Sequence, residues 1–197
     1  MLALFAFLSV VLNIAAYLPY FRDILAGKTK PHRTTWFIYF LLTISTFSTQ
    51  VALGASGYLW LLGTQAIMMF LVFALSIKYG VGGFSRLDIV CLIGALAGLL
   101  VWWVLDNPAY TLYLNIVIDI IATIPTIVKA WRYPHTETAI TWALGILAAF
   151  FGILAAHTTV FNLYLGPLYT LLISTLVTTL IVRKRIMGLH LPKALSK

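Results

Sequence analysis

The sequence predicts an all-α integral membrane protein with seven transmembrane helices, and three observations support this. Of the 197 residues, 62% are hydrophobic and only 9% are charged, whereas soluble domains are about 25% charged. Seven apolar runs are each long enough for a bilayer core of about 30 Å, which takes about 20 helical residues. The basic residues lie at the ends of these runs. Together these features exclude a soluble globular protein.

Charged residues, or turn-forming Gly and Pro residues, separate the seven expected spans. In chain order the spans cover residues 2–21, 35–53, 58–77, 87–105, 110–128, 139–156 and 161–182. The first run has no basic residue before it, which disfavours a signal peptide. Few residues remain for any domain outside the membrane.

The distribution of the basic residues predicts the orientation of the spans. All 13 Lys and Arg residues follow the first, third, fifth or seventh span, and the other connections carry none. Because cytoplasmic loops are enriched in Lys and Arg, we expect an outer N-terminus and a cytoplasmic C-terminus in a prokaryotic plasma (inner) membrane. The net charge of +8 therefore indicates topology and contact with the lipid bilayer, and it does not indicate binding to nucleic acid.

The chain also contains an internal repeat. It matches itself without gaps at an offset of 106 residues, which pairs Pro19 with Pro125 and Trp36 with Trp142. Each copy holds three spans, and an odd number reverses the chain, so the fourth span must return it before the second copy. The domains expected from this 3+1+3 layout are repeat 1 (1–79), a linker helix with its flanking loops (80–107), repeat 2 (108–185) and a basic cytoplasmic tail (186–197). Parallel repeats of this kind place a binding site between the copies.

With this layout the chain resembles the SWEET and PQ-loop transporter superfamily over nearly its whole length. The Pro-Gln pair of that family reads Pro19-Tyr20 and Pro125-Thr126 here, so both prolines are kept and both glutamines are absent. The chain is not assigned to a subfamily. The resemblance implies two parallel three-helix bundles around a central cavity, with Pro19 and Pro125 as hinges. A fixed kink at each proline is the alternative.

Asp119 is the sharpest candidate for a functional residue. It is the tenth residue of the expected span 110–128 and so lies near mid-membrane, and its repeat counterpart is Asn13. An acid at that depth costs about 2.5–3.5 kcal/mol, and such residues face the bundle interior or a wet cavity. We expect Asp119 to contact the solute or to carry a coupled proton. A hydrogen bond that joins two helices is the alternative.

Other polar side chains recur at matching positions of the two repeats and suggest the two walls of one pathway. The candidates for solute binding or proton coupling are Ser9, Asn13, Tyr17, Gln65, Asn115, Asp119, Thr123 and Ser174. Helix interfaces joined by small polar residues are the alternative. Trp36, Trp142 and Tyr20 are candidates for a gate, although the two tryptophans also suit an interfacial aromatic belt.

No motif of a hydrolase, a metalloprotease or a phosphate-binding loop occurs in the sequence, so we expect no enzymatic activity, no cofactor and no metal. The predicted function is transport of a small polar solute, such as a sugar, vitamin, nucleoside or amino-acid-like molecule, by alternating access. A receptor, or a trafficking or assembly factor on the same scaffold, is the alternative. A central cavity lined by Asn13, Gln65 and Asp119 would favour transport. Assembly of copies into a homo-oligomer is left open.

Overall fold

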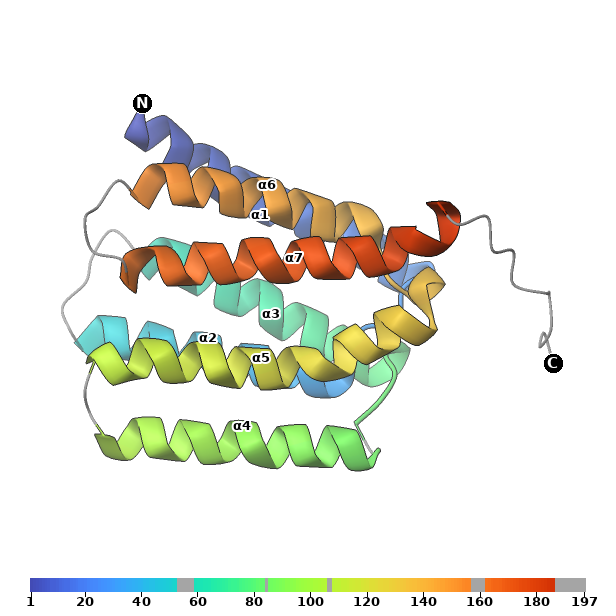
Figure 1. Cartoon of the computed structure of the whole chain (residues 1–197), viewed down its shortest axis with the longest axis horizontal. Helices are drawn as coiled ribbons and strands as arrows, with labels where there is room; N and C mark the ends of the chain where they lie inside the picture. The colour runs from blue at the N-terminus through green and yellow to red at the C-terminus, as the bar shows by residue number, and fades with distance from the viewer. Residues whose placement is uncertain (53–58, 84, 106–107, 157–161, 187–197) are drawn as a thin grey trace.

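The computed structural model describes residues 1–52, 59–83, 85–105, 108–156 and 162–186. Within these ranges the chain forms seven α-helices and one short 3₁₀ helix, which confirms the all-α prediction (Figure 1). The elements are α1 (Leu2–Leu25), α2 (Arg33–Ala52), α3 (Leu59–Tyr79), α4 (Arg86–Leu105), α5 (Pro108–Arg132), η1 (Pro134–Thr136), α6 (Ala139–Ala156) and α7 (Asn162–Ile186).

α1 and α5 extend at their C-terminal ends past the apolar spans expected from the sequence. α1 continues to Leu25 because no helix-breaking residue intervenes before Gly27, which has a φ of +68°. A glycine in this left-handed conformation commonly terminates a helix. The backbone N–H groups of Lys28 and Thr29 then turn back to the carbonyl of Asp23, at 2.9 and 3.0 Å. The connection to α2 is therefore a compact turn.

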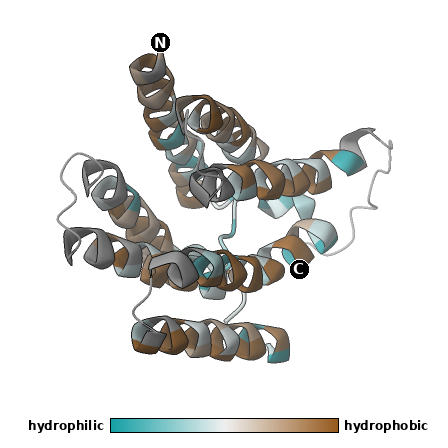
Figure 2. Cartoon of the chain, turned by 60° about the vertical axis from the view of Figure 1, so that its left-hand side comes forward, coloured by the Kyte–Doolittle hydropathy of each residue, from teal (hydrophilic) through white to brown (hydrophobic). Residues whose placement is uncertain are grey.

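Two helices of the described residues are long and apolar enough to cross a membrane, namely Ala3–Leu25 and Tyr113–Arg132. Three further apolar helices are shorter: Gly63–Tyr79, Ala139–Ala155 and Leu168–Arg183. Every α-helix nevertheless exposes large apolar side chains, and hydrophobic residues run along most of the helices in Figure 2. Soluble monomers rarely leave extended apolar surfaces uncovered, so the surface is compatible with a membrane.

The contacts between helices follow the internal repeat. At the 106-residue offset, α1, α2 and α3 correspond to α5, α6 and α7. α1 packs against α3 as α5 packs against α7, and α2 packs against α3 as α6 packs against α7. The contact between α1 and α6 has its counterpart between α5 and α2. α4 has no repeat counterpart, and it packs against α5 and α2 along one side of the bundle (Figure 1).

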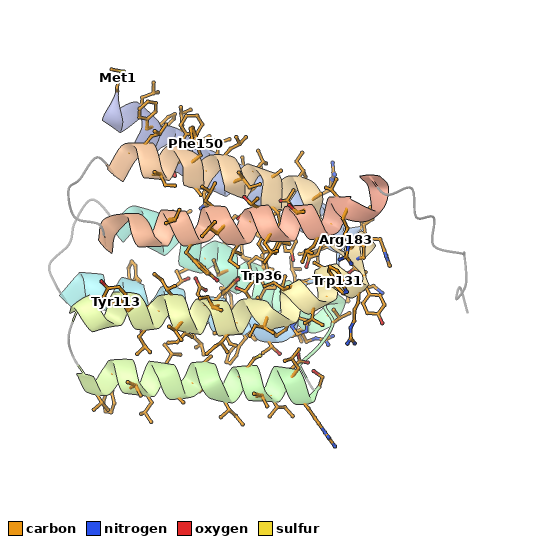
Figure 3. The ribbon with its side chains drawn as sticks, in the orientation of Figure 1. Met1, Trp36, Tyr113, Trp131, Phe150 and Arg183 are labelled. Carbon is orange, nitrogen blue, oxygen red and sulfur yellow. The ribbon has the colours of Figure 1, made fainter. Side chains whose placement is uncertain are left out.

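The largest buried cluster centres on aromatic residues from α1 and α2. The ring of Trp36 lies 5.3 Å from that of Tyr20, 5.8 Å from that of Tyr39 and 6.4 Å from that of Tyr17, measured between centroids. Aromatic pairs at such distances contribute about 0.5–1.5 kcal/mol each beyond their burial. Figure 3 shows Trp36 in the interior of the bundle. At the edge of the bundle, Arg183 of α7 stacks on Trp131 of α5, 3.3 Å from the ring centroid (Figure 3).

The connection between α3 and α4 is fastened to the start of α2. The backbone of Val81 donates to Pro31 and accepts from Arg33, at 2.9 and 3.0 Å. The Arg33 guanidinium donates to the carbonyls of Ser76 and Gly82, both at 3.0 Å. These bonds join the start of α2 to the end of α3 and to the connection that follows it.

α4 begins with a reciprocal cap. The hydroxyl of Ser85 accepts from the backbone N–H of Asp88, and the Asp88 carboxylate accepts from the N–H of Ser85, both at 3.1 Å. This is the capping-box arrangement, which satisfies two otherwise unpaired N–H groups of the first turn. The same carboxylate accepts from the N–H of Gly83 at 2.6 Å and lies 3.3 Å from Nε2 of His32.

Candidate functional site

A cavity of about 280 Å³ lies between the helices of the two repeats. Its described lining residues come from α1, α2 and α3 and from α5, α6 and α7, and none comes from α4. It is near the small end of the range of ligand pockets, about 300–1,000 Å³. The cavity therefore has room for a small molecule.

Eight of the residues singled out in the sequence line this cavity. They are Asn13, Tyr17, Trp36, Gln65, Asn115, Asp119, Trp142 and Ser174. Among these eight, two repeat pairs have both members in the wall, namely Asn13 with Asp119 and Trp36 with Trp142. The cavity thus brings equivalent positions of the two repeats to one place.

Ser9 and Thr123 do not line the cavity, because each is used in a contact between helices. The Ser9 hydroxyl donates to the carbonyl of Ala148 on α6 at 2.8 Å. Thr123 is fully buried, and its hydroxyl bonds to those of Tyr39 on α2 and Tyr169 on α7, the second at 3.0 Å. These placements match the alternative reading of small polar residues as helix-joining groups.

Pro19, Pro125 and Tyr20 lie just beyond the cavity, toward the ends of α1 and α5. Both helices run on through their proline, α1 to Leu25 and α5 to Arg132. Tyr20 is fully buried and belongs to a polar cluster at this end of the bundle.

That cluster, here called the loop-end cluster, consists of Tyr20, Trp36, Lys129, Glu137 and Trp142. The indole of Trp36 donates to the Tyr20 hydroxyl at 3.2 Å, and this hydroxyl donates to Oε2 of Glu137 at 3.4 Å. The indole of Trp142 donates to the same Oε2 at 3.3 Å. The tryptophans of the two repeats are therefore linked through one buried carboxylate.

A buried ion pair completes the loop-end cluster. Nζ of Lys129 lies 2.5 Å from Oε1 of Glu137, and neither side chain is more than 6% exposed. Nζ also donates to the backbone carbonyl of Lys30 in the α1–α2 connection. Because a buried charge is costly without a partner, the ion pair holds Glu137 beside Lys129 within repeat 2. The bond from Nζ to the Lys30 carbonyl ties repeat 2 to repeat 1.

The two connections that carry Lys30 and Glu137 also bind each other directly. The N–H of Lys30 donates to the carbonyl of Thr136 at 3.0 Å, and these two residues are repeat counterparts. The hydroxyls of Thr29 and Thr138 share a hydrogen bond, and that of Thr138 donates to Asp23 at 3.1 Å. Contacts between the repeats thus join the two connections at this end of the bundle.

Sequence reasoning missed Glu137, Tyr39 and Tyr169. Glu137 is the only glutamate of the chain and stands directly before the sixth span, which was the available signal. Tyr39 follows Trp36 by three residues and so shares its helix face. Tyr169 has Gly63 as its repeat counterpart, so the repeat offers no signal for it.

The cavity wall combines one carboxylate with amides and aromatic rings. Asp119 is its single charged lining residue, and the ion pairs of the described residues are Arg22–Asp23, His32–Asp88 and Lys129–Glu137. The described part of the chain contains no group of three His, Cys, Asp or Glu side chains placed to share a metal ion. The wall can therefore bind a small molecule through charge, hydrogen bonds and ring contacts.

Comparison with protein-family models, curated proteins and solved structures finds no match to this chain.

Proposed function

We propose that the protein is a seven-span membrane transporter that moves a small polar solute by alternating access through the cavity. The observation that carries the proposal is the cavity itself, whose wall includes Asn13, Gln65 and Asp119 from both repeats. A receptor or assembly factor on the same scaffold needs no such space, and a filled centre would favour it. The solute class is sugar-like, vitamin-like, nucleoside-like or amino-acid-like.

The charge pattern and the helix lengths support insertion of all seven helices. The shortest helix, α6, has 18 residues and is about 27 Å long at 1.5 Å per residue, close to the bilayer core of about 30 Å. The basic residues all follow odd-numbered spans. We therefore place the N-terminus outside and the loop-end cluster at the cytoplasmic face of a prokaryotic inner membrane.

The paired helix contacts support the 3+1+3 layout. Every contact within α1–α3 has a counterpart within α5–α7, while α4 packs outside them as a linker. The same layout underlies the resemblance to the SWEET and PQ-loop superfamily. Two similar bundles can rock against each other around a central site.

In this mechanism the cytoplasmic end is closed in the present conformation. Opening it requires the bundles to separate where Tyr20 of repeat 1 donates to Glu137 of repeat 2, and where Lys129 of repeat 2 donates to the Lys30 carbonyl of repeat 1. Pro19 and Pro125 lie between the cavity and this closure. A proline removes one backbone hydrogen bond within a helix, so the segment beyond it can tilt more easily.

Asp119 is the proposed carrier of a coupled proton, and its replacement tests the mechanism. A thermal-shift screen of the purified protein against sugars, vitamins, nucleosides and amino acids first selects the solute. In proteoliposomes, Asp119→Asn should then abolish accumulation driven by a pH gradient, because an amide cannot take up the proton. Exchange of labelled for unlabelled solute should persist, because exchange needs no net proton movement.

Asp88→Asn is the matched control, since its carboxylate lies at the start of α4 and not in the cavity wall. Its pH-driven accumulation should resemble that of the native chain. Unchanged accumulation in Asp119→Asn would contradict proton coupling. Failure of the native protein to exchange any solute that binds would contradict transport.

A further inference from the structure

The charge on the cavity wall has one sign. Asp119 is the only ionisable acid in the described lining, and no Lys, Arg or His side chain lines the cavity. The ion pairs of the described residues join other acids, as Lys129 joins Glu137, and none includes Asp119. A carboxylate that is partly removed from water, as that of Asp119 is, is costly unless an opposite charge compensates it. An anionic solute would be repelled by the ionised carboxylate, whereas a cation would compensate its charge.

Aromatic rings share the cavity with this carboxylate. Five of them contribute to the wall, namely Tyr17, Trp36, Tyr39, Trp142 and Tyr169. The faces of aromatic rings attract cations, most strongly for Trp, and rings arranged as a cage bind quaternary ammonium groups. A single acid among five rings is therefore complementary to an organic cation.

Hydrogen bonds hold two of these rings beside Asp119. The hydroxyls of Tyr39 and Tyr169 both bond to the hydroxyl of Thr123, the second at 3.0 Å. Thr123 in turn donates to the carbonyl of Asp119, one helical turn earlier on α5. Because their hydroxyls are engaged with Thr123, both tyrosines are fixed near the carboxylate. The ring of Tyr39 is also packed edge-on against Trp36, at an interplanar angle of 83°.

We propose that the solute of this cavity is a small organic cation, a protonated amine or a quaternary ammonium compound, with Asp119 as its counter-ion and the aromatic rings around its charged group. This inference rests on the proposed function and narrows it. The volume of about 280 Å³ limits the solute to a small molecule. The amides of Asn13 and Gln65 are placed to meet a second polar group on the solute.

Matched pairs of probes test the charge requirement. Choline is compared with dimethylbutanol, in which carbon replaces nitrogen, and phenylethylamine is compared with phenylethanol. Binding to the purified, detergent-solubilised full chain is measured by calorimetry. Phenylethylamine should bind about tenfold to a hundredfold more tightly than phenylethanol, because its ammonium group can donate a charge-assisted hydrogen bond to Asp119. Choline has no N–H to donate, so its preference over dimethylbutanol, about tenfold or more, comes from charge attraction and from cation–π contacts. Equal affinities within both pairs, or no binding of either cation, would overturn the inference.

Two variants test whether the preference for cations depends on the carboxylate and on its position in the cavity wall. Asp119→Asn keeps the shape of the side chain and should abolish the preference for the cation. The exchange variant Asn13→Asp/Asp119→Asn moves the carboxylate to the repeat counterpart in the same cavity wall and should restore the preference. A cation preference that survives in Asp119→Asn would overturn the role of Asp119. If Asp119→Asn does not fold, the binding preference of the exchange variant tests the proposal on its own. A folded exchange variant that does not prefer cations would count against the proposal.

Transport of the same probes distinguishes this inference from the proposed function. If neutral solutes bind and are exchanged in proteoliposomes while cations do not bind, the result would support transport and overturn the proposal that the solute is a cation. Selective binding of choline or phenylethylamine without exchange across the bilayer would support the cation site and contradict transport.

Discussion

His32 shows how one buried residue can make the stability of the fold depend on pH. The residue is 7% exposed, its Nε2 faces Asp88 at 3.3 Å, and its Nδ1 has no hydrogen-bond partner among the described residues. Burial lowers the pKa of His32 from 6.5 to about 4; the charges of Lys129 and Arg33 add to this effect, and Asp88 opposes it. The folded protein therefore keeps a neutral imidazole at neutral pH.

We predict that the protein loses stability as the pH falls from about 6.5 to about 4. In this window the unfolded chain takes up a proton at His32 that the folded chain does not, so protons favour unfolding. This difference in pKa corresponds to a decrease in the free energy of unfolding on the order of 3 kcal/mol. Melting temperatures of the solubilised protein should fall across this range. His32→Gln keeps a donor for Asp88 without a titrating group, and an equally steep fall in that variant would contradict the assignment to His32.

At the scale of elements, the α3–α4 connection contains a glycine, Gly82, that leaves no room for a side chain. Gly82 has a φ of +78°, and a Cβ added there would lie 2.2 Å from Nε2 of His32. Gly27 has a similar φ of +68°, but a Cβ there would meet no atom within 4 Å. The two glycines therefore separate backbone strain from steric overlap.

Gly82→Ala should lower the free energy of unfolding more than Gly27→Ala does. The left-handed conformation costs a residue with a Cβ about 1–2 kcal/mol, and both variants bear that cost. Overpacking against His32 adds a further 1–3 kcal/mol or so at Gly82 alone. Chemical denaturation of the solubilised variants measures both values. Equal losses would show that the corner around His32 has room to adjust.

At the scale of the whole molecule, the two repeats pack along α1 with α6 and along α2 with α5, and they are also joined at the loop-end cluster and the connections beside it. Thr29 and Thr138 come from equivalent regions of the two repeats, and their hydroxyls are in hydrogen-bonding contact. Both residues are nearly fully buried. Under the proposed function, these contacts must break before the cavity can open to the cytoplasm.

A disulfide between these positions should lock the proposed transporter. In Thr29→Cys/Thr138→Cys the two sulfur atoms replace contacting hydroxyl groups, and the native Cys91 is buried and does not compete. Oxidation should stop exchange of choline across proteoliposomes while its binding persists, and a reductant should restore exchange. Thr29→Cys alone should be insensitive to oxidation. Continued exchange by the fully oxidised double variant would show that this end does not need to open.

Much of the fold could be predicted because its signals are linear in the sequence. The length of each apolar run sets the length of a helix, and the gaps between runs hold the residues that end helices, such as Gly27. The repeat offset likewise places Asn13 and Asp119 at equivalent heights of equivalent helices, and both line the cavity. These relations need no knowledge of which helices are neighbours.

Tertiary structure alone decided which polar residues face the cavity. Helical periodicity indicates that Ser9 and Asn13 share a face, and likewise Asp119 and Thr123, but not which neighbouring helix covers part of that face. α6 takes the hydroxyl of Ser9, and Thr123 is enclosed between two tyrosines. Glu137 joins the site because the two connections meet across the repeats. The sequence by itself determined that the chain is helical, whereas packing between helices decided the wall of the cavity, because contacts between distant segments depend on the rotation of each helix against its neighbours.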